Sequence, residues 1–290
     1  TKPMAEEQHP KPAPKGGQQT LSTSGSQAMK TSHSKFNWFL IGRILLAVLT
    51  ITLFLLSWEG LVRWQDYPTF ILPRPAEVWT KLLIVLADGS LWHHAAVTIA
   101  EILGGLTLGL SVALVLGYLL AKSPTLDRLL SPYIVALQSF PVIALAPLLV
   151  IWISDGETRT VLVAALTLFF PALVNTVVGL RSVEPELLAL MHSLQATHWQ
   201  IFRILEIPSA LPMLFGGIKV GVTLAVIGAV IGEFVGTNRG LGFLINLSRG
   251  LLDTPLLFVA LFTLILIALG LYGLVSLLEY HFLAWKRTDS

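Results

Sequence analysis

Six long apolar stretches dominate this chain from residue 38 to residue 278. A bilayer core about 30 Å thick is crossed by a helix of about 20 mainly apolar residues. Unpaired backbone groups are costly in hydrocarbon, so a helix is the form that such a stretch takes there. The predicted spans are residues 38–58, 102–121, 129–153, 160–180, 211–234 and 255–278. The sequence therefore predicts an all-α membrane protein with about six transmembrane helices.

The composition excludes several other classes of protein. Only 12% of the 290 residues are charged and 54% are hydrophobic, whereas about 25% of the residues in a soluble domain are charged. The net charge of +2 is spread along the chain, so nucleic acid is not an expected partner. No phosphate-binding G-x-x-x-x-G-K-[ST] loop and no cysteine occur. We therefore expect no catalytic activity, no bound cofactor and no metal site in this chain.

Two regions differ sharply in composition. Residues 1–35 are rich in Lys, Pro, Gly, Gln and Ser and carry almost no large apolar side chain. Such a segment cannot bury enough surface to offset the entropy of ordering, and we expect a disordered tail. Residues 36–287 form the predicted transmembrane domain.

Lysines and arginines predict the orientation of these spans, because cytoplasmic loops carry an excess of both. With six spans, the two termini share one side of the membrane. That side holds Lys30, Lys35, Arg43, Lys122, Arg128, Arg181, Arg203, Lys286 and Arg287, and the other side holds Arg63, Arg74, Lys81, Arg159, Arg239 and Arg249. Both termini and the longest internal loop, residues 184–208, are therefore predicted to be cytoplasmic.

Polar residues inside the apolar stretches are candidates for a transport pathway. Gln138 and Asn175 either face such a pathway or form hydrogen bonds between helices. An intramembrane carboxylate such as Glu233 is by default a functional candidate. Alternatively, Glu233 forms a structural ion pair with Lys219 or Arg239. We weigh the structural role of Glu233 above the functional one.

Other residues have simpler interpretations. Glu101 begins the second span and is expected to be solvated at the interface. Gly105 and Gly109, four residues apart, favour close approach of another helix. Pro141 lies within the third predicted span, where a proline removes a backbone donor and can kink the helix.

The 184–208 loop has the pattern of two amphipathic helices. Pro185 suits a first helical turn, and Leu190 and Leu194 recur at helical spacing. A second helix is expected to begin near His198 and to be stopped by Pro208. Such a helix pair either docks a partner or lies on the bilayer surface.

The loop and its surroundings resemble the permease subunits of bacterial ATP-binding-cassette (ABC) importers, of the nitrate, sulfonate and taurine branch. That family has a cytoplasmic loop E-A-A-x3-G-x9-I-x-L-P, whose helices seat in a groove of the ATPase subunit. Ala189 stands at the first position of the motif, Gln195 at its glycine, and Leu205 to Pro208 at I-x-L-P. Further similar stretches are LPRPAEVW, SFPVIALAPLLVIW, FFPALVNTVVGLRSVEPELL, IPSALPMLFGGIKVG, IGEFVG, RGLGFLI and LLEYHFLAW.

The resemblance implies a fold, a set of partners and a group of coupling residues. The fold is the type I importer permease architecture, also described as MetI-like, in the bacterial inner membrane. The partners are cytoplasmic ATPase subunits, a second permease subunit, an external binding protein and the lipid bilayer. The residues matched to the coupling loop are Glu186, Ala189, Leu190, His192, Leu194, Gln195, Ala196, Thr197, Trp199, Phe202 and Pro208.

Function is then import of a small solute. Solutes in this family are nitrate, sulfonate or taurine-like anions, and vitamins or their precursors such as a thiamine pyrimidine or riboflavin. The alternative is a secondary transporter driven by an ion gradient. Its paired carboxylates would be expected near the middle of the membrane, whereas Glu59, Glu101 and Glu233 lie near the span ends. A scaffold without transport is the third possibility.

The absence of cysteine allows a direct test of the predicted topology. Single cysteines at Ser90, Thr158 or Thr237 should react with an impermeant thiol reagent added outside intact cells. Cysteines at Ser123, Ser193 or Ser290 should react only after the membrane is opened. The reverse pattern would refute the orientation, and a mixed pattern would refute the number of spans.

Overall fold

The computed structural model describes residues 31–283, with the backbone alone for 31–41 and 44, and this part of the chain is helical without strands. The chain divides after Ser57 into two units, which are described separately. The elements are α1 (Thr31–Gln65), α2 (Pro75–Ala87), α3 (Ser90–Lys122), α4 (Pro124–Gln138), η1 (Val142–Ala144), α5 (Ala146–Trp152), α6 (Gly156–Arg181), α7 (Pro185–Ser193), α8 (His198–Ile201), η2 (Phe202–Glu206), α9 (Ile207–Phe234), α10 (Leu241–Leu251) and α11 (Thr254–Phe282). The all-α membrane fold predicted from the sequence is confirmed.

Within residues 31–283, five helices are long and apolar enough to cross a membrane, and a bent pair raises the number to six if it counts as one span. The span in α1 covers Leu45–Gln65, later in the chain than the predicted 38–58. Of the predicted tail, residues 1–30 lie outside the described part, and residues 31–35 belong to α1. Helix α3 begins at Ser90, well before the predicted residue 102. The first turns of α3 contain polar residues, so a prediction based on apolar runs placed the start of this helix too late.

The predicted third span, residues 129–153, is broken in the structure. Helix α4 ends at Gln138, and the following segment Val142–Trp152 is bent away from it by 73°. Pro141 lies in the break, and the residue that precedes a proline disfavours the helical region. The kink expected at this proline is therefore a full interruption of the helix.

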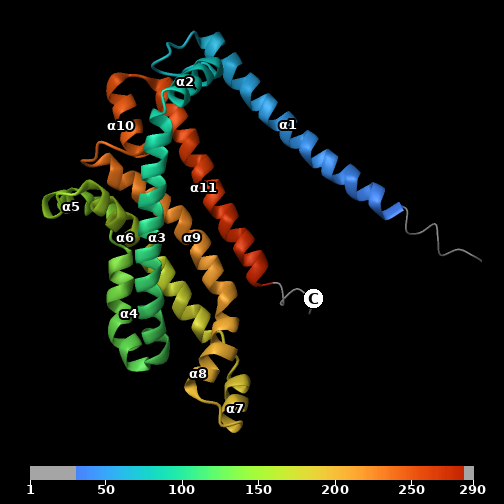
Figure 1. Cartoon of the computed structure of the whole chain (residues 1–290), viewed down its shortest axis with the longest axis vertical. Helices are drawn as coiled ribbons and strands as arrows, with labels where there is room; N and C mark the ends of the chain where they lie inside the picture. Colours follow the sequence, from blue (N-terminus) through green and yellow to red (C-terminus); the bar gives the residue numbers. More distant parts are fainter. Residues whose placement is uncertain (1–30, 284–290) are drawn as a thin grey trace, which may run out of the picture. The chain divides into compact units, whose positions relative to one another are not determined.

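The centre of the second unit, which begins at Trp58, is α6 with α3 and α9 packed along it. Figure 1 shows these three helices side by side, with α2 and α10 at one end and α7 and α8 at the other. A Cβ on Gly105 would lie 2.5 Å from the Cβ of Ala164, and one on Gly109 would lie 2.8 Å from the carbonyl oxygen of Ala165. The close helix approach predicted from the spacing of these two glycines is confirmed.

An ion pair secures the end of the second unit that carries α2. The ammonium of Lys81 in α2 binds the carboxylate of Asp253, which lies between α10 and α11. The other carboxylate oxygen of Asp253 accepts from the amide of Leu256, 3.2 Å away, at the start of α11. One carboxylate therefore caps α11 and holds α2 beside it.

Candidate functional site

The first half of the 184–208 loop is α7. Pro185 occupies its first turn, and Glu186 lies beside the positive end of the helix dipole. The side chains of Glu186, Ala189, Leu190 and His192 are exposed. Leu190 and Leu194 are exposed to 54% and 69%. This helix thus presents apolar side chains that nothing in the described chain covers.

Gln195 ends α7 in a left-handed conformation, with a φ of +55°. Its amide donates to the carbonyl of His192 at 3.0 Å, and the amide of Ala196 donates to the carbonyl of Met191 at 3.0 Å. These two bonds define the Schellman motif, whose left-handed position is usually occupied by glycine. The turn is therefore made even though glutamine stands at the glycine of the family motif.

Helix α8 begins at the other side of this turn. The side-chain oxygen of Thr197 accepts from the amide of Gln200, and the side chain of Gln200 accepts from the amide of Thr197, so the pair forms a capping box. Trp199 follows and is 66% exposed. Its ring lies 5.6 Å from the partly buried ring of Phe202, measured between centroids. The cap and the ring contact give the exposed indole a defined position.

Pro208 does not stop the second helix, which corrects the prediction from sequence. The chain runs helically from His198 to Phe234 through the π-helical turn η2, Phe202–Glu206. In η2 the amide of Ile207 donates to the carbonyl of Phe202, five residues earlier. Because of this wider turn, Pro208 falls in the first turn of α9, where its missing N–H is tolerated.

Glu233, near the opposite end of α9, is 1% exposed, and its carboxylate is hydrogen-bonded to other residues of the chain. It accepts from the hydroxyl of Thr98 at 2.6 Å and from the amide of Gly242. Thr98 in turn accepts from the amide of Leu241 at 2.8 Å. Gly240, with a φ of +99°, passes so close to the Glu233 carboxylate that no side chain fits there. These contacts fasten the loop between α9 and α10 to α3, and they favour a structural role for Glu233.

The ion pairs suggested for Glu233 are absent from the described residues. Lys219 binds Glu279 in α11 instead, and Arg239 lies 3.6 Å from Glu157. Glu101 is 3% exposed and is therefore not solvated at the interface, contrary to the prediction. The partners of Glu233, Lys219 and Arg239 could not be predicted from spacing along the sequence, because each partner lies in a different element from the residue that it binds.

A polar cavity of about 510 Å³ opens beside Glu101. Its wall includes Glu101, Asp155, Glu157, Thr237 and Arg239. Hydrogen bonds from the side chain and the amide of Thr158 hold the pKa of Asp155 below its usual value. The cavity therefore offers both carboxylate acceptors and, through Arg239 and Thr237, hydrogen-bond donors. Among residues 31–283 no three His, Asp or Glu side chains are grouped so as to hold a metal ion.

Arg159 binds Gly236, which lines this cavity, and the sequence did not predict Arg159 as a site residue. The guanidinium is buried and donates to the carbonyls of Ile153 at 3.0 Å and Gly236 at 2.6 Å. It thereby joins the start of α6 to the ends of α5 and α9.

The other two polar candidates lie apart from this cluster. The amide of Asn175 donates to the carbonyl of Pro171 in the same helix at 2.8 Å. Gln138 is exposed at the last residue of α4. The structure therefore does not bring Gln138, Asn175 and Glu233 together into one site.

Residues 105–284 match the family of binding-protein-dependent transport system inner membrane components. The chain belongs to this family, which consists of the permease subunits of ABC importers. It is accordingly a non-catalytic, multi-pass inner-membrane permease for a small solute. The assignment from the sequence to this class is confirmed.

Similar proteins place the chain within that family. The riboflavin transport system permease protein RibX of Chloroflexus aurantiacus is 46% identical over 93% of this chain and 100% of its own length. The formylaminopyrimidine transport permease protein ThiX of Halalkalibacterium halodurans is 34% identical over 79% of this chain and 91% of its own length. An amino acid ABC transporter crystal structure is 19% identical, covers 69% of this chain and 97% of its own, and has a TM-score of 0.55, which supports the fold.

The left-handed turn at Gln195 generates a prediction. Gln195→Gly should keep or raise the stability of the solubilised protein, because glycine adopts positive φ without steric cost. Gln195→Val should lower the free energy of unfolding by about 1–2 kcal/mol, since a β-branched residue is strained in that region. Thermal unfolding in detergent measures both. Equal stability of the two variants would show that the left-handed conformation is not kept.

Proposed function

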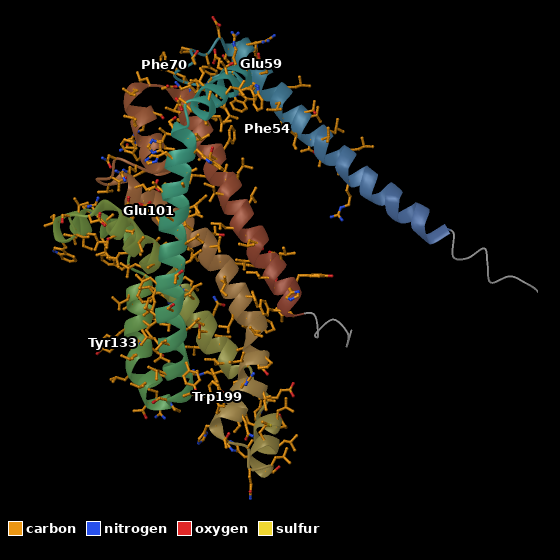
Figure 2. The ribbon with its side chains drawn as sticks, in the orientation of Figure 1. Phe54, Glu59, Phe70, Glu101, Tyr133 and Trp199 are labelled. Carbon is orange, nitrogen blue, oxygen red and sulfur yellow. The ribbon has the colours of Figure 1, made fainter. Side chains whose placement is uncertain are left out.

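We propose that the 184–208 loop is the element by which this permease docks its ATPase subunit. The exposed apolar side chains of Leu190, Leu194 and Trp199 carry the proposal, because a short helix pair with uncovered anchors fits a groove in a partner. Figure 2 shows Trp199 at the α7 and α8 end of the second unit, away from Glu101. The match of the loop to the family motif supports the same role.

The alternative is that the helix pair lies on lipid. Helix α7 carries the carboxylate of Glu186 on its exposed surface, and Glu184 precedes it at the N-cap. Anionic groups interact unfavourably with the negatively charged cytoplasmic leaflet. The exposed surface of α7 is therefore better suited to a protein groove than to the membrane surface.

The same proposal sets the orientation and the assembly. Lys122, Arg128, Arg181 and Arg203 lie at or near the loop end of the second unit, which fits a cytoplasmic position for this end and for both termini. We infer that the working importer contains two permease subunits, ATPase subunits and an external binding protein. ATP binding would move the loops and reopen the pathway by alternating access.

For the solute we propose a vitamin of the riboflavin class. The similarity to the riboflavin permease, 46% identity over 93% of this chain, carries this choice. The taurine transport system permease protein TauC of Escherichia coli is less similar, with 27% identity over 86% of the chain.

The docking role predicts the effect of one substitution. Trp199→Ala should weaken binding of the co-expressed ATPase roughly 30-fold, corresponding to about 2 kcal/mol for a buried aromatic anchor. Co-purification from detergent, titrated with free ATPase, measures the change. Trp92→Ala is the matched control, because Trp92 is 77% exposed but belongs to the first turn of α3, at the opposite end. Full retention of the ATPase by Trp199→Ala would instead favour the lipid-lying loop.

The proposed solute predicts an uptake phenotype. Cells that cannot make riboflavin should take up labelled riboflavin when this chain, its ATPase and its binding protein are co-expressed. Uptake should stop when ATP is depleted but continue when the ion gradients are collapsed. Uptake that follows the ion gradient would favour the secondary transporter. Uptake of labelled taurine but not of labelled riboflavin by the same cells would refute the solute class.

A further inference from the structure

We propose that two side-chain pairs, Lys122 with Glu206 and Tyr118 with Phe202, form a strut that transmits movement of the docking loop to helix α3. The proposal rests on the docking role given above. It goes beyond that role because it names the residues of the permease through which the force passes.

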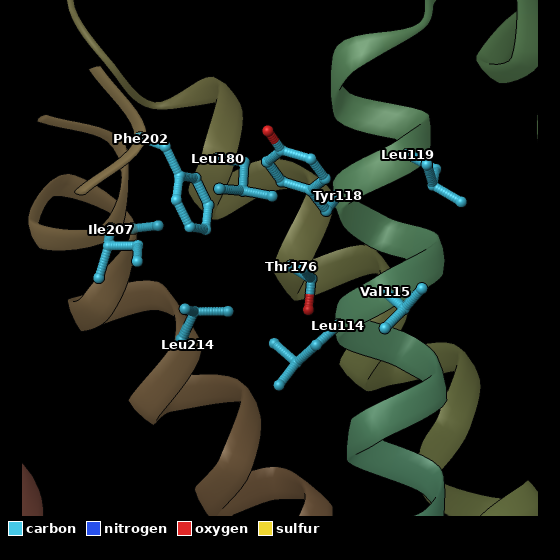
Figure 3. A pocket seen from close by; sticks show the side chains of 10 residues that line it. Leu114, Val115, Tyr118, Leu119, Thr176, Leu180, Phe202, Ile207 and Leu214 are labelled. Carbon is cyan, nitrogen blue, oxygen red and sulfur yellow. The ribbon is translucent and has the colours of Figure 1, made fainter. Parts of the chain in front are cut away.

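The strut consists of two residues on each side, with the same spacing on both. Tyr118 and Lys122 are four residues apart at the end of α3, so they share one face of that helix. Phe202 and Glu206 are likewise four apart and are the first and last residues of η2. The ring centroids of Tyr118 and Phe202 lie 5.2 Å apart at an interplanar angle of 77°, an edge-to-face contact. Figure 3 shows these two rings facing each other across the gap between their helices.

Glu206 makes the charged half of this contact. It is 3% exposed, although most of the loop before it is open to solvent. One carboxylate oxygen binds the ammonium of Lys122, while the other has no partner among the described residues. A buried carboxylate is strongly destabilised when its cation is removed. Glu206 and Lys122 are therefore expected to stay together as the loop moves.

The π-helical turn gives the loop side of the strut a place to move. A π-helical turn holds an extra residue and is weaker than the α-helix on either side, and such turns are frequent at functional sites. Next to it lies an apolar cavity of about 440 Å³, lined by Leu114, Thr176, Leu180, Phe202 and Leu214 among others. Side chains of η2 can shift into this space without first displacing a packed neighbour.

The receiving side of the strut is braced. Arg181 at the end of α6 binds Asp127 in α4 at 3.0 Å and donates to the carbonyl of Leu120 in α3 at 3.1 Å. These contacts tie the ends of α3, α4 and α6 together. A displacement of η2 that pulls on Lys122 therefore acts on three helices and not on one side chain.

A charge exchange tests the strut. Lys122→Glu and Glu206→Lys should each retain the co-purified ATPase but lower binding-protein-stimulated hydrolysis and uptake about tenfold or more, within the range of ordinary coupling free energies. The double variant should recover most of the loss, because it restores the ion pair with its charges reversed. A double variant no better than the worse single variant would overturn the proposal.

Conservative variants cover the case in which an exchanged charge prevents folding. Lys122→Arg keeps the cation and should couple like the wild type, whereas Glu206→Gln keeps the size but loses the charge and should uncouple hydrolysis from uptake. Elution as a single species in detergent shows that each is folded. Wild-type coupling in Glu206→Gln would overturn the strut alone. Failure of the wild-type chain to bind the ATPase would overturn the docking role and the strut with it.

Discussion

Lipid tails are as apolar as leucine, so the hydrophobic effect does little to hold one membrane helix against another, and close van der Waals contact must do so instead. In this chain that contact is concentrated on α6. Gly105 of α3 faces the Cβ of Ala164 from one side, and a Cβ on Gly228 of α9 would lie 2.6 Å from the Cα of the same alanine. Since α6 fixes both neighbours at such short range, the ends of α3 and α9 are placed closely enough to build polar contacts between them.

Those contacts have a common plan. Glu206 lies just before the first residue of α9 and Glu233 just before its last, and both carboxylates are buried. Each has a partner in α3, Lys122 at one end and Thr98 at the other. The chemistry differs between the ends. Glu233 is held by a hydroxyl and a backbone amide with little room beside it, whereas Glu206 meets a flexible lysine next to a cavity. The Glu233 end is thus suited to be a fixed point and the Glu206 end to be the moving one.

Local chemistry made much of this structure predictable. Apolar runs of sufficient length predicted the membrane helices, and two glycines four residues apart predicted that another helix packs closely on α3, although not that this helix is α6. What could not be predicted depends on partners far away in sequence. Glu101 is buried although its neighbours in sequence suggest an interface. The π-helical turn at Phe202–Glu206 could not be predicted from the sequence either, because its side chains pack against Tyr118 and Lys122 in another helix.

The 184–208 loop keeps the turn of the family motif although the residue at the turn has changed. The turn at Gln195 needs a left-handed residue, and a non-glycine residue there costs only about 1–2 kcal/mol, so the family glycine can be lost while the turn survives. The second half is constrained differently, because Phe202 and Glu206 contact α3 of the same chain. Side chains of the first half, such as Leu190 and Leu194, are mostly exposed, so packing within the described chain constrains their identity little. This contrast explains why the resemblance to the family is weak at Ala189 and Gln195 yet close from Leu205 to Pro208. If the loop docks the ATPase as proposed, the first half is constrained by the surface of that partner, whereas the second half is constrained by packing against α3 of the permease itself.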